Sequence, residues 1–249
     1  MAHACWAAAR IPGTLVREDP GLVLVDSGLP CDTFNFVCRS RLAPAEAPAA
    51  IAGALGHFRA VARPYSWWVG PADRPRDLGA RLRDHGLEAA ESELAMAADL
   101  AGLPAAAGPA GLEIRRVRLP TELRDFARVN AANWDPPDQQ VLRFHELTAQ
   151  LTLAPGSPQW FYVGYLGGTP VAAAELTIGG GVAGLYGIST LAAHRRHGFG
   201  SALTLRPLRD ARAAGLVTAV LQASAEGAPM YRRLGFAPFG EITEYKPGR

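Results

Sequence analysis

Residues 194–200, with the sequence HRRHGFG, are the stretch on which the fold prediction rests. The residues before it, 184–190 (GLYGIST), are typical of a strand, and residues 201–214 place apolar side chains at helical intervals. The first N–H groups of a helix have no partner inside it, and the helix dipole is positive there. Glycines at 198 and 200 let a ligand approach the backbone without a Cβ in the way. The stretch therefore predicts a site for a phosphate or pyrophosphate.

The order Arg-x-x-Gly-x-Gly, after a strand and before a helix, resembles the acetyl-CoA pyrophosphate loop of the Gcn5-related N-acetyltransferase (GNAT) family. A second signature, Tyr-x-x-Leu-Gly-Phe at residues 231–236, is typical of that family's last helix and strand. The stretch lacks the Gly-Lys-Ser/Thr ending of a nucleotide P-loop and the G-x-G-x-x-G of a dinucleotide fold. The resemblance covers roughly residues 111–249.

The resemblance implies an α/β (α+β) fold with a mixed, mostly antiparallel sheet flanked by helices. We expect a GNAT acetyltransferase domain at 110–249 and a second, smaller α/β domain at 1–109 that resembles a degenerate GNAT-like copy. The Pro- and Gly-rich stretch 103–111 is the best candidate for a linker between them.

Residue patterns predict the elements of both halves. In the C-terminal half the expected strands and helices follow one another in chain order: strand 112–117, helix 120–134 with Thr121 as N-cap, helix 138–151, and strands 160–166, 170–178 and 182–190. In the N-terminal half we expect strands 22–28, 32–39, 65–70 and 91–99 and helices 47–61 and 77–85, the last ended by Gly86 in a left-handed conformation.

The stretch 67–87 is similar to the stretch 219–236. Both are predicted as strand, turn, helix, and a glycine followed by a hydrophobic residue, which indicates an internal repeat. The alternative is that helix-Gly-hydrophobic is simply a common way to end a helix. If the repeat is real, the first copy lacks the loop, because nothing before Trp67 has the Arg-x-x-Gly-x-Gly pattern.

The reaction implied by the resemblance is direct attack of an amine on a thioester, without a covalent enzyme intermediate. Tyr231 matches the position at which many family members carry a general acid. Glu175 is a lone carboxylate on an Ala-rich strand and is the candidate general base, since a buried unpaired carboxylate is costly. Tyr186 and Glu226 are weaker alternatives, and packing or a solvated strand face would explain Tyr231 or Glu175 without function.

The predicted acetyl-CoA contacts come from the end of the strand, the loop, the first helical turn and the strand that follows. The resemblance gives the strand backbone the pantetheine arm and the loop the pyrophosphate. The predicted residues are Ile188, Ser189, Thr190, Arg195, Arg196, His197, Gly198, Phe199, Gly200, Ser201 and Ser224.

Composition limits the partners. The net charge of +2 predicts no nucleic-acid or anionic-membrane partner, and no stretch is long and apolar enough to span a bilayer. The cysteines at 5, 31 and 38 carry no metal-ligand spacing and indicate reduced thiols in a cytoplasmic protein; His194 and His197 have no third ligand nearby, so we expect no metal. Residues 1–11 do not read as a signal peptide.

The sequence thus predicts an acetyl-CoA-dependent N-acetyltransferase, monomeric or homodimeric, that acts on a small-molecule or peptide amine. A non-catalytic acetyl-CoA sensor or regulatory module is the main alternative, which would keep the loop and lose the acid and base. A phosphate-binding protein of another fold is disfavoured by the antiparallel strands before the loop.

Overall fold

The computed structural model describes residues 6–7, 13–19, 21–105 and 108–248. The expectations for Cys5 and for most of residues 1–11 lie outside these ranges. Neither of the two described cysteines, Cys31 and Cys38, forms a disulfide. No helix within the described ranges is long and apolar enough to cross a membrane.

The chain forms two compact units, and two of its strands belong partly to one unit and partly to the other. Unit 1 comprises residues 1–95 and 240–249, and unit 2 comprises residues 96–239. Unit 1 therefore contains the end of the last strand of the chain, and unit 2 contains the end of a strand that begins in unit 1. The predicted boundary after residue 109 stays a prediction.

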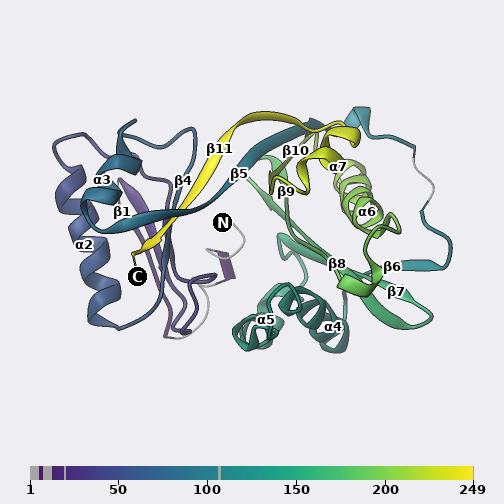
Figure 1. Ribbon diagram of the computed structural model, residues 1–249. Coiled ribbons are helices and arrows are strands. Elements are labelled where there is room, and N and C mark those ends of the chain that lie inside the picture. Colours follow the sequence, from purple (N-terminus) through teal and green to yellow (C-terminus); the bar gives the residue numbers. More distant parts are fainter. Residues whose placement is uncertain (1–5, 8–12, 20, 106–107, 249) are drawn as a thin grey trace. The chain divides into compact units, whose positions relative to one another are not determined.

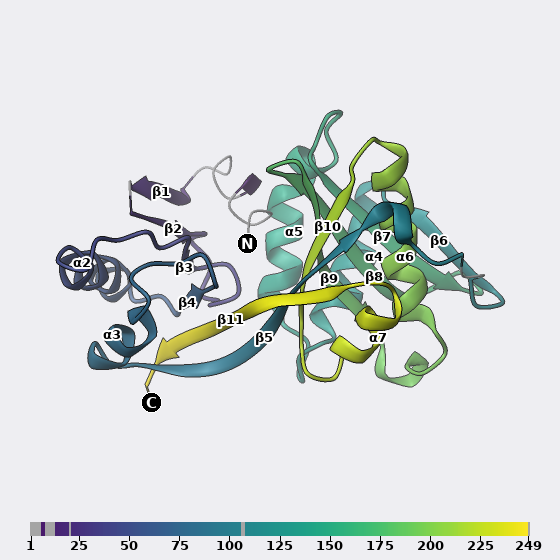
Figure 2. The same ribbon diagram turned by 90° about the horizontal axis from the view of Figure 1, so that it is seen from above.

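Unit 1 contains a sheet with the order β1-β2-β3-β4-β11 and, next to β11, the first part of β5. Its elements are β1 (Leu15–Asp19), β2 (Leu22–Asp26), β3 (Phe36–Cys38), α2 (Ala47–Ala60), β4 (Ser66–Val69), α3 (Leu78–Asp84), β5 (Leu87–Asp99) and β11 (Ala237–Pro247). Strands β3 and β4 are parallel, whereas β1–β2, β2–β3 and β4–β11 are antiparallel. Strands β5 and β11 run side by side, and a 3.0 Å hydrogen bond joins the hydroxyls of Ser92 and Thr243 (Figures 1 and 2).

The core of unit 1 lies where α2 and α3 cover the sheet. Ile51 and Phe58 of α2 and Leu82 of α3 pack with Trp67 of β4, and all four are almost fully buried. The indole N–H of Trp67 donates to Ser40 Oγ at 3.0 Å, so this large side chain is buried without an unsatisfied donor.

Unit 2 has the strand order β10-β9-β8-β7-β6, with the end of β5 next to β10. Its elements are η1 (Leu100–Gly102), β6 (Leu112–Arg116), α4 (Pro120–Ala131), α5 (Gln139–Thr152), β7 (Gln159–Leu166), β8 (Thr169–Gly179), β9 (Val182–Thr190), η2 (Ala192–His194), α6 (Phe199–Ala213), β10 (Thr218–Ala223) and α7 (Ala228–Arg233). Strands β6 to β9 are antiparallel and β10 is parallel to β9.

Helices cover both faces of the unit 2 sheet, with α4 and α5 on one face and α6 on the other (Figure 1). The alternation of strand β7 explains this, because successive side chains point to opposite faces. Phe161 packs edge-on against Phe126 of α4, whereas the hydroxyl of Tyr162 donates to Asp210 of α6 at 2.9 Å. The α/β fold class and the mostly antiparallel sheet expected from the sequence are confirmed.

Most predicted elements are present with shifted ends. The predicted strand at 32–39 is only β3, and β1 was not predicted. Thr121 is not the N-cap of α4: Leu119 holds that position and Pro120 is the first helical residue. The carboxylate of Glu122 accepts from the N–H groups of Arg118 and Leu119 at 2.7 and 3.1 Å, so it reaches back to the N-cap residue as in a capping box.

The two similar stretches have the same order of elements, β4-α3-β5 and β10-α7-β11. Each short helix is followed by a glycine with positive φ, Gly86 at +85° and Gly235 at +94°, as a left-handed cap requires. This agreement extends the sequence similarity to the backbone, as an internal repeat would.

Candidate functional site

The loop between β9 and α6 has the geometry of an anion site. Gly198 is the N-cap of α6 with φ +79°, and no side chain caps the helix. The first bond of the helix ladder runs from Ala202 N to Gly198 O at 3.1 Å. The N–H groups of residues 199–201 therefore have no helical acceptor and remain available for a ligand.

Two loop side chains bind the loop backbone. Arg195 Nε donates to the carbonyl of Thr190, the end of β9, at 3.2 Å, and His197 Nδ1 donates to the carbonyl of Arg195 at 2.7 Å. Arg196 has φ +66° and is exposed. The side chains of the predicted residues Arg195 and His197 are thus hydrogen-bonded to the backbone of the loop, whereas the role of Arg196 stays a prediction.

The strands that precede the loop separate from each other. Strand β10 pairs with β9 in parallel at three positions, the last being Leu221 with Leu185. Among the described residues, no pairing between β9 and β10 follows this position, although β9 continues to Thr190. The edge of β9 from Gly187 to Thr190, which includes the predicted contacts Ile188 and Thr190, thus has no paired strand on the side of β10, as an extended ligand added as a strand would require.

A β-bulge lies in β9 at this free edge. Ala173 pairs with Ser189 and Glu175 pairs with Tyr186, so the single residue Ala174 faces two residues of β9. One of these two is Gly187, whose φ is +55° and at which a Cβ would lie 2.7 Å from Asn130 Nδ2. Only glycine satisfies both conditions without strain.

Two asparagines, Asn130 and Asn133, hydrogen-bond to residues of the bulge and its neighbour Ser189. Asn130 Nδ2 donates to the carbonyl of Gly187 at 3.1 Å, and Asn133 Nδ2 donates to Ser189 Oγ at 2.7 Å. The hydroxyl of Ser189 in turn donates to the carbonyl of Gly187 at 3.2 Å. The predicted contact Ser189 is therefore buried and directed to the asparagines, and only its backbone lies at the edge of β9. Sequence reasoning missed both asparagines, although Gly187 inside a strand pattern signals a bulge.

Glu175 is a buried carboxylate next to the bulge. Its side chain is 5% exposed, and Oε1 accepts from Gln159 Nε2 at 3.1 Å and from the hydroxyl of Thr177 at 2.8 Å. Burial raises the pKa of Glu175 to about 7, because two neutral donors offset only part of the lost hydration. Such a pKa lets a carboxylate take up or release a proton near neutral pH. The weaker alternative Tyr186 lies directly opposite on β9.

Tyr231 lies in α7, close to the start of α6. The neighbouring Met230 packs at Gly200, where a Cβ would lie 3.4 Å from its sulfur. Tyr231 is 8% exposed and contacts Phe236 edge-on at 6.0 Å. The other alternative, Glu226, is exposed in the turn before α7.

The remaining predicted contacts surround the loop. The hydroxyl of Ser224 accepts from Gly227 N at 3.2 Å and stabilises the turn into α7. Phe199 is buried as the first residue of α6, and Ser201 is half-buried in the same helical turn. The roles of all these residues stay predictions.

Comparisons with known proteins agree with this geometry. The model of the acetyltransferase (GNAT) family matches residues 122–236. A GCN5-related N-acetyltransferase from Kribbella flavida is similar over 99% of this chain and 96% of its own, with 24% identity and a TM-score of 0.75. A functionally unknown conserved protein from Staphylococcus epidermidis matches 96% of each chain at 16% identity and a TM-score of 0.69.

A tandem GNAT protein from the clavulanic acid biosynthesis pathway is also similar, over 99% of this chain and 88% of its own. Its identity is 16% and its TM-score is 0.64. At these identities the solved structures establish the fold of the chain. No curated protein matches the sequence.

Proposed function

Because residues 122–236 belong to the acetyltransferase (GNAT) family, we propose that the protein is an acetyl-CoA-dependent N-acetyltransferase. It transfers the acetyl group directly to an amine of a small-molecule or peptide acceptor. We expect it to be cytoplasmic and to need no metal, as a monomer or homodimer without a nucleic-acid or membrane partner.

The observation that carries this proposal is the separation of β9 and β10 immediately before the uncapped N-terminus of α6. The pantetheine arm of acetyl-CoA contains amides, and the edge of residues 187–190, which has no paired strand on the side of β10, offers complementary backbone groups. The pyrophosphate carries negative charge, and the first turn of α6 offers free N–H groups and the positive end of the helix dipole. Arg196, an exposed residue of the same loop, adds a positive charge.

The chemistry requires one proton to leave the amine and one to reach the thiolate. We assign the first to Glu175, whose pKa of about 7 leaves much of it ionised at neutral pH. As the amine nitrogen forms a bond to the carbonyl carbon, the C–S bond breaks and its electron pair stays on sulfur. We assign protonation of that sulfur to the Tyr231 hydroxyl. One turnover leaves Glu175 protonated and Tyr231 as a phenolate, so a proton must pass from Glu175 to Tyr231, directly or through solvent, before the next turnover.

A sensor without catalysis would need the loop and the free edge of β9 alone. Glu175 argues for the enzyme, because a sensor gains nothing from a buried carboxylate with only neutral hydrogen-bond donors.

The test is a screen of amine acceptors with acetyl-CoA in which release of free thiol is followed. The matched control is the Gly198→Asn variant, which keeps a residue that tolerates positive φ and obstructs the backbone of the loop. We expect at least one class of amine to give turnover that Gly198→Asn reduces. Saturable acetyl-CoA binding without thiol release for any amine would contradict the enzyme and support the sensor.

A further inference from the structure

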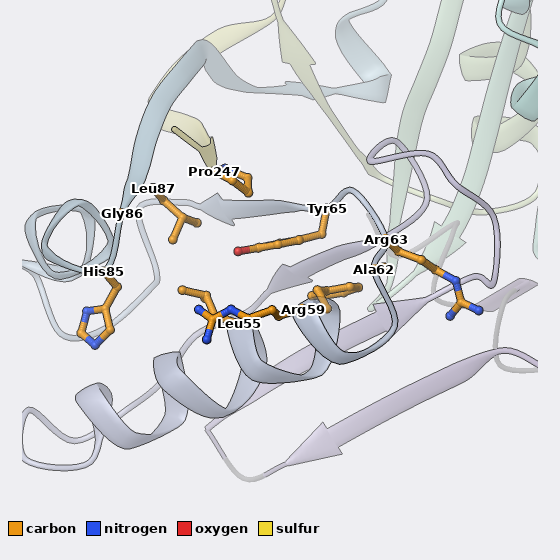
Figure 3. Close-up of a pocket in the computed structure, with 10 residues that line it drawn as sticks. Leu55, Arg59, Ala62, Arg63, Tyr65, His85, Gly86, Leu87 and Pro247 are labelled. Carbon is orange, nitrogen blue, oxygen red and sulfur yellow. The ribbon is translucent and has the colours of Figure 1, made fainter. Parts of the chain in front are cut away.

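A separate pocket of about 500 Å³ lies in unit 1 at the C-terminal end of α2 (Figure 3). It is built only from unit 1 residues and shares none with the proposed acetyl-CoA site. The lining residues are Leu55, Phe58, Arg59, Ala62, Arg63, Tyr65, His85, Gly86, Leu87 and Pro247. This volume lies in the range of pockets that hold small organic ligands.

The walls of the pocket are largely apolar. Tyr65 stacks on Phe58 with 4.5 Å between ring centroids and an angle of 7° between the planes. In Figure 3, Tyr65 extends between Leu55 on one side and Leu87 with Pro247 on the other. A flat apolar group is the shape that fits beside such a stacked pair, since aromatic rings prefer offset or edge contacts with one another.

The polar groups that reach this apolar space come from Arg59 and Tyr65. In Figure 3 the Arg59 guanidinium and the Tyr65 hydroxyl lie on the same side of the pocket. No described residue pairs with the side chain of Arg59 or hydrogen-bonds the Tyr65 hydroxyl. Burial raises the pKa of Tyr65, with the charge of Arg59 opposing that rise, so the phenol is a neutral hydrogen-bond donor beside a cation.

The other charges around the pocket do not neutralise Arg59. Arg63 points away from the pocket in Figure 3, and its guanidinium is paired with Asp26 at 2.6 Å. His85 Nδ1 donates to the carbonyl of Arg81 at 2.8 Å. The lining contains no acid, and Glu88, the next residue along β5, is exposed. One unpaired cation over an apolar pocket favours an anionic ligand.

We propose that this pocket binds a small organic monoanion with a flat apolar body, of the class of aromatic carboxylates. Arg59 pairs with the carboxylate, the Tyr65 hydroxyl donates to it, and the ring packs against Tyr65, Leu87 and Pro247. The proposed site belongs to unit 1, and binding of the anion there does not require acetyl-CoA.

The experiment titrates phenylacetate into the full-length protein by calorimetry and ligand-observed NMR. Phenylacetamide serves as the neutral probe of the same shape and phenethylamine as the cationic one. We expect one saturable site for phenylacetate, at least tenfold weaker binding of both other probes, and at least tenfold weaker phenylacetate binding in Arg59→Gln. Tyr65→Phe should weaken phenylacetate about threefold, as loss of one hydrogen bond would.

Matched controls separate this site from the rest of the protein. Arg76→Gln removes an exposed arginine of the same unit that does not line the pocket, and Gly198→Asn alters the loop before α6; both should leave phenylacetate binding unchanged. Thermal unfolding of each variant establishes that it folds. Equal affinity for the three probes, or phenylacetate affinity unaffected by Arg59→Gln in a folded protein, would overturn the proposal.

Discussion

Each unit contains two parallel strands that are connected by a long helix. In unit 1 the strands β3 and β4 are connected by α2, and in unit 2 the strands β9 and β10 are connected by α6. In unit 2 the pairing of β9 with β10 ends at Leu185 and Leu221, although β9 itself continues to Thr190. In unit 1 the segments that follow β3 and β4 are hydrogen-bonded to each other, so the two segments do not separate as β9 and β10 do.

Backbone hydrogen bonds join these two segments of unit 1. Arg74 N donates to the carbonyl of Ser40 at 2.8 Å, and Leu42 N donates to the carbonyl of Arg74 at 3.2 Å. The Ser40 hydroxyl also accepts from the indole of Trp67. The donors and acceptors that would receive an extended ligand are thus already used within the protein.

The helices also begin differently. The N-cap of α2 is Glu46, in a right-handed conformation and with a carboxylate, whereas the N-cap of α6 is Gly198. A negative charge at this position repels a pyrophosphate, and its side chain obstructs close approach to the N–H groups. We infer that the two units differ in acetyl-CoA binding, because unit 2 has an open strand edge and a helix N-terminus without a capping side chain. We therefore expect one acetyl-CoA site per chain.

A third difference concerns the candidate acid. When the two repeats are aligned on Gly86 and Gly235, Tyr231 corresponds to Leu82. Leu82 is fully buried in the core of unit 1 and can donate no proton. Unit 1 therefore lacks the phenol as well as the open edge.

The largest expected effect comes from removing the hydroxyl of Tyr231, which the corresponding residue of unit 1, Leu82, also lacks. Tyr231→Phe should lower kcat about a hundredfold, because a general acid contributes in the transition state, while acetyl-CoA affinity stays nearly unchanged. Steady-state kinetics with a good acceptor and calorimetry with acetyl-CoA measure the two quantities. Unchanged turnover would place the acid elsewhere or show that the thiolate leaves unaided.

The second-largest expected effect comes from a substitution at the N-cap of α6, Gly198. Gly198→Asp gives α6 an acidic N-cap like that of α2 and should weaken acetyl-CoA binding more than tenfold, or about 1.4 kcal/mol. Aspartate tolerates positive φ better than most residues, so the loop should retain its fold. The neutral Gly198→Asn variant separates the effect of charge from that of size. If a second site of comparable affinity survives in Gly198→Asp, unit 1 binds acetyl-CoA and the comparison between the units fails.

A smaller effect should follow from loosening the β-bulge in β9. Asn133→Ala removes the 2.7 Å bond to Ser189 Oγ, and Asn130 then holds the bulge alone. We expect the KM for acetyl-CoA to rise about two- to tenfold, the worth of one neutral hydrogen bond, with a smaller change in kcat. Gln150→Ala, an exposed change on α5, is the control for general effects. An unchanged KM in the Asn133→Ala and Ser189→Ala double variant would exclude a positioning role.

The sequence was sufficient for the loop and its flanking elements because these features are local. Glycines at a helix start and the pattern of residues 194–200 depend on neighbours along the chain. The asparagine contacts to the bulge could not be predicted, since Asn130 and Ser189 meet only once α4 packs on the sheet. The hydrogen bond between Arg74 and Ser40 in unit 1 could not be predicted for the same reason, because these two residues belong to separate loops with no motif of their own.

One buried carboxylate from each unit, Asp26 and Glu175, shows a further difference. Asp26 of unit 1 is buried, and burial tends to raise its pKa. The N–H of Gly28, His57 at 2.8 Å and the charge of Arg63 outweigh burial and hold the pKa of Asp26 below its usual value. Glu175 of unit 2 has only neutral hydrogen-bond donors, and its pKa rises to about 7. A paired carboxylate of the first kind stabilises the fold, whereas one of the second kind costs stability when ionised.

The last expected effect is on the pH dependence of stability. Between pH 4.5 and about 7 the native protein holds the Glu175 proton that the unfolded chain has lost, so the free energy of unfolding falls as pH rises, by up to ~1.4 kcal/mol per pH unit. Glu175→Gln should reduce this slope, and Glu93, whose pKa burial also raises to about 7, should account for part of the slope that remains. For Asp26 the sign is opposite: its contribution is present above pH 3.8 and is lost as pH falls below that value, so Asp26→Asn should alter only the acid limb. Urea unfolding of the wild type and both variants from pH 3 to 8 measures each slope. A Glu175→Gln slope identical to that of the wild type would show that Glu175 is not the group whose proton is held near neutral pH, and the base would then have to be sought among its neighbours, beginning with Tyr186.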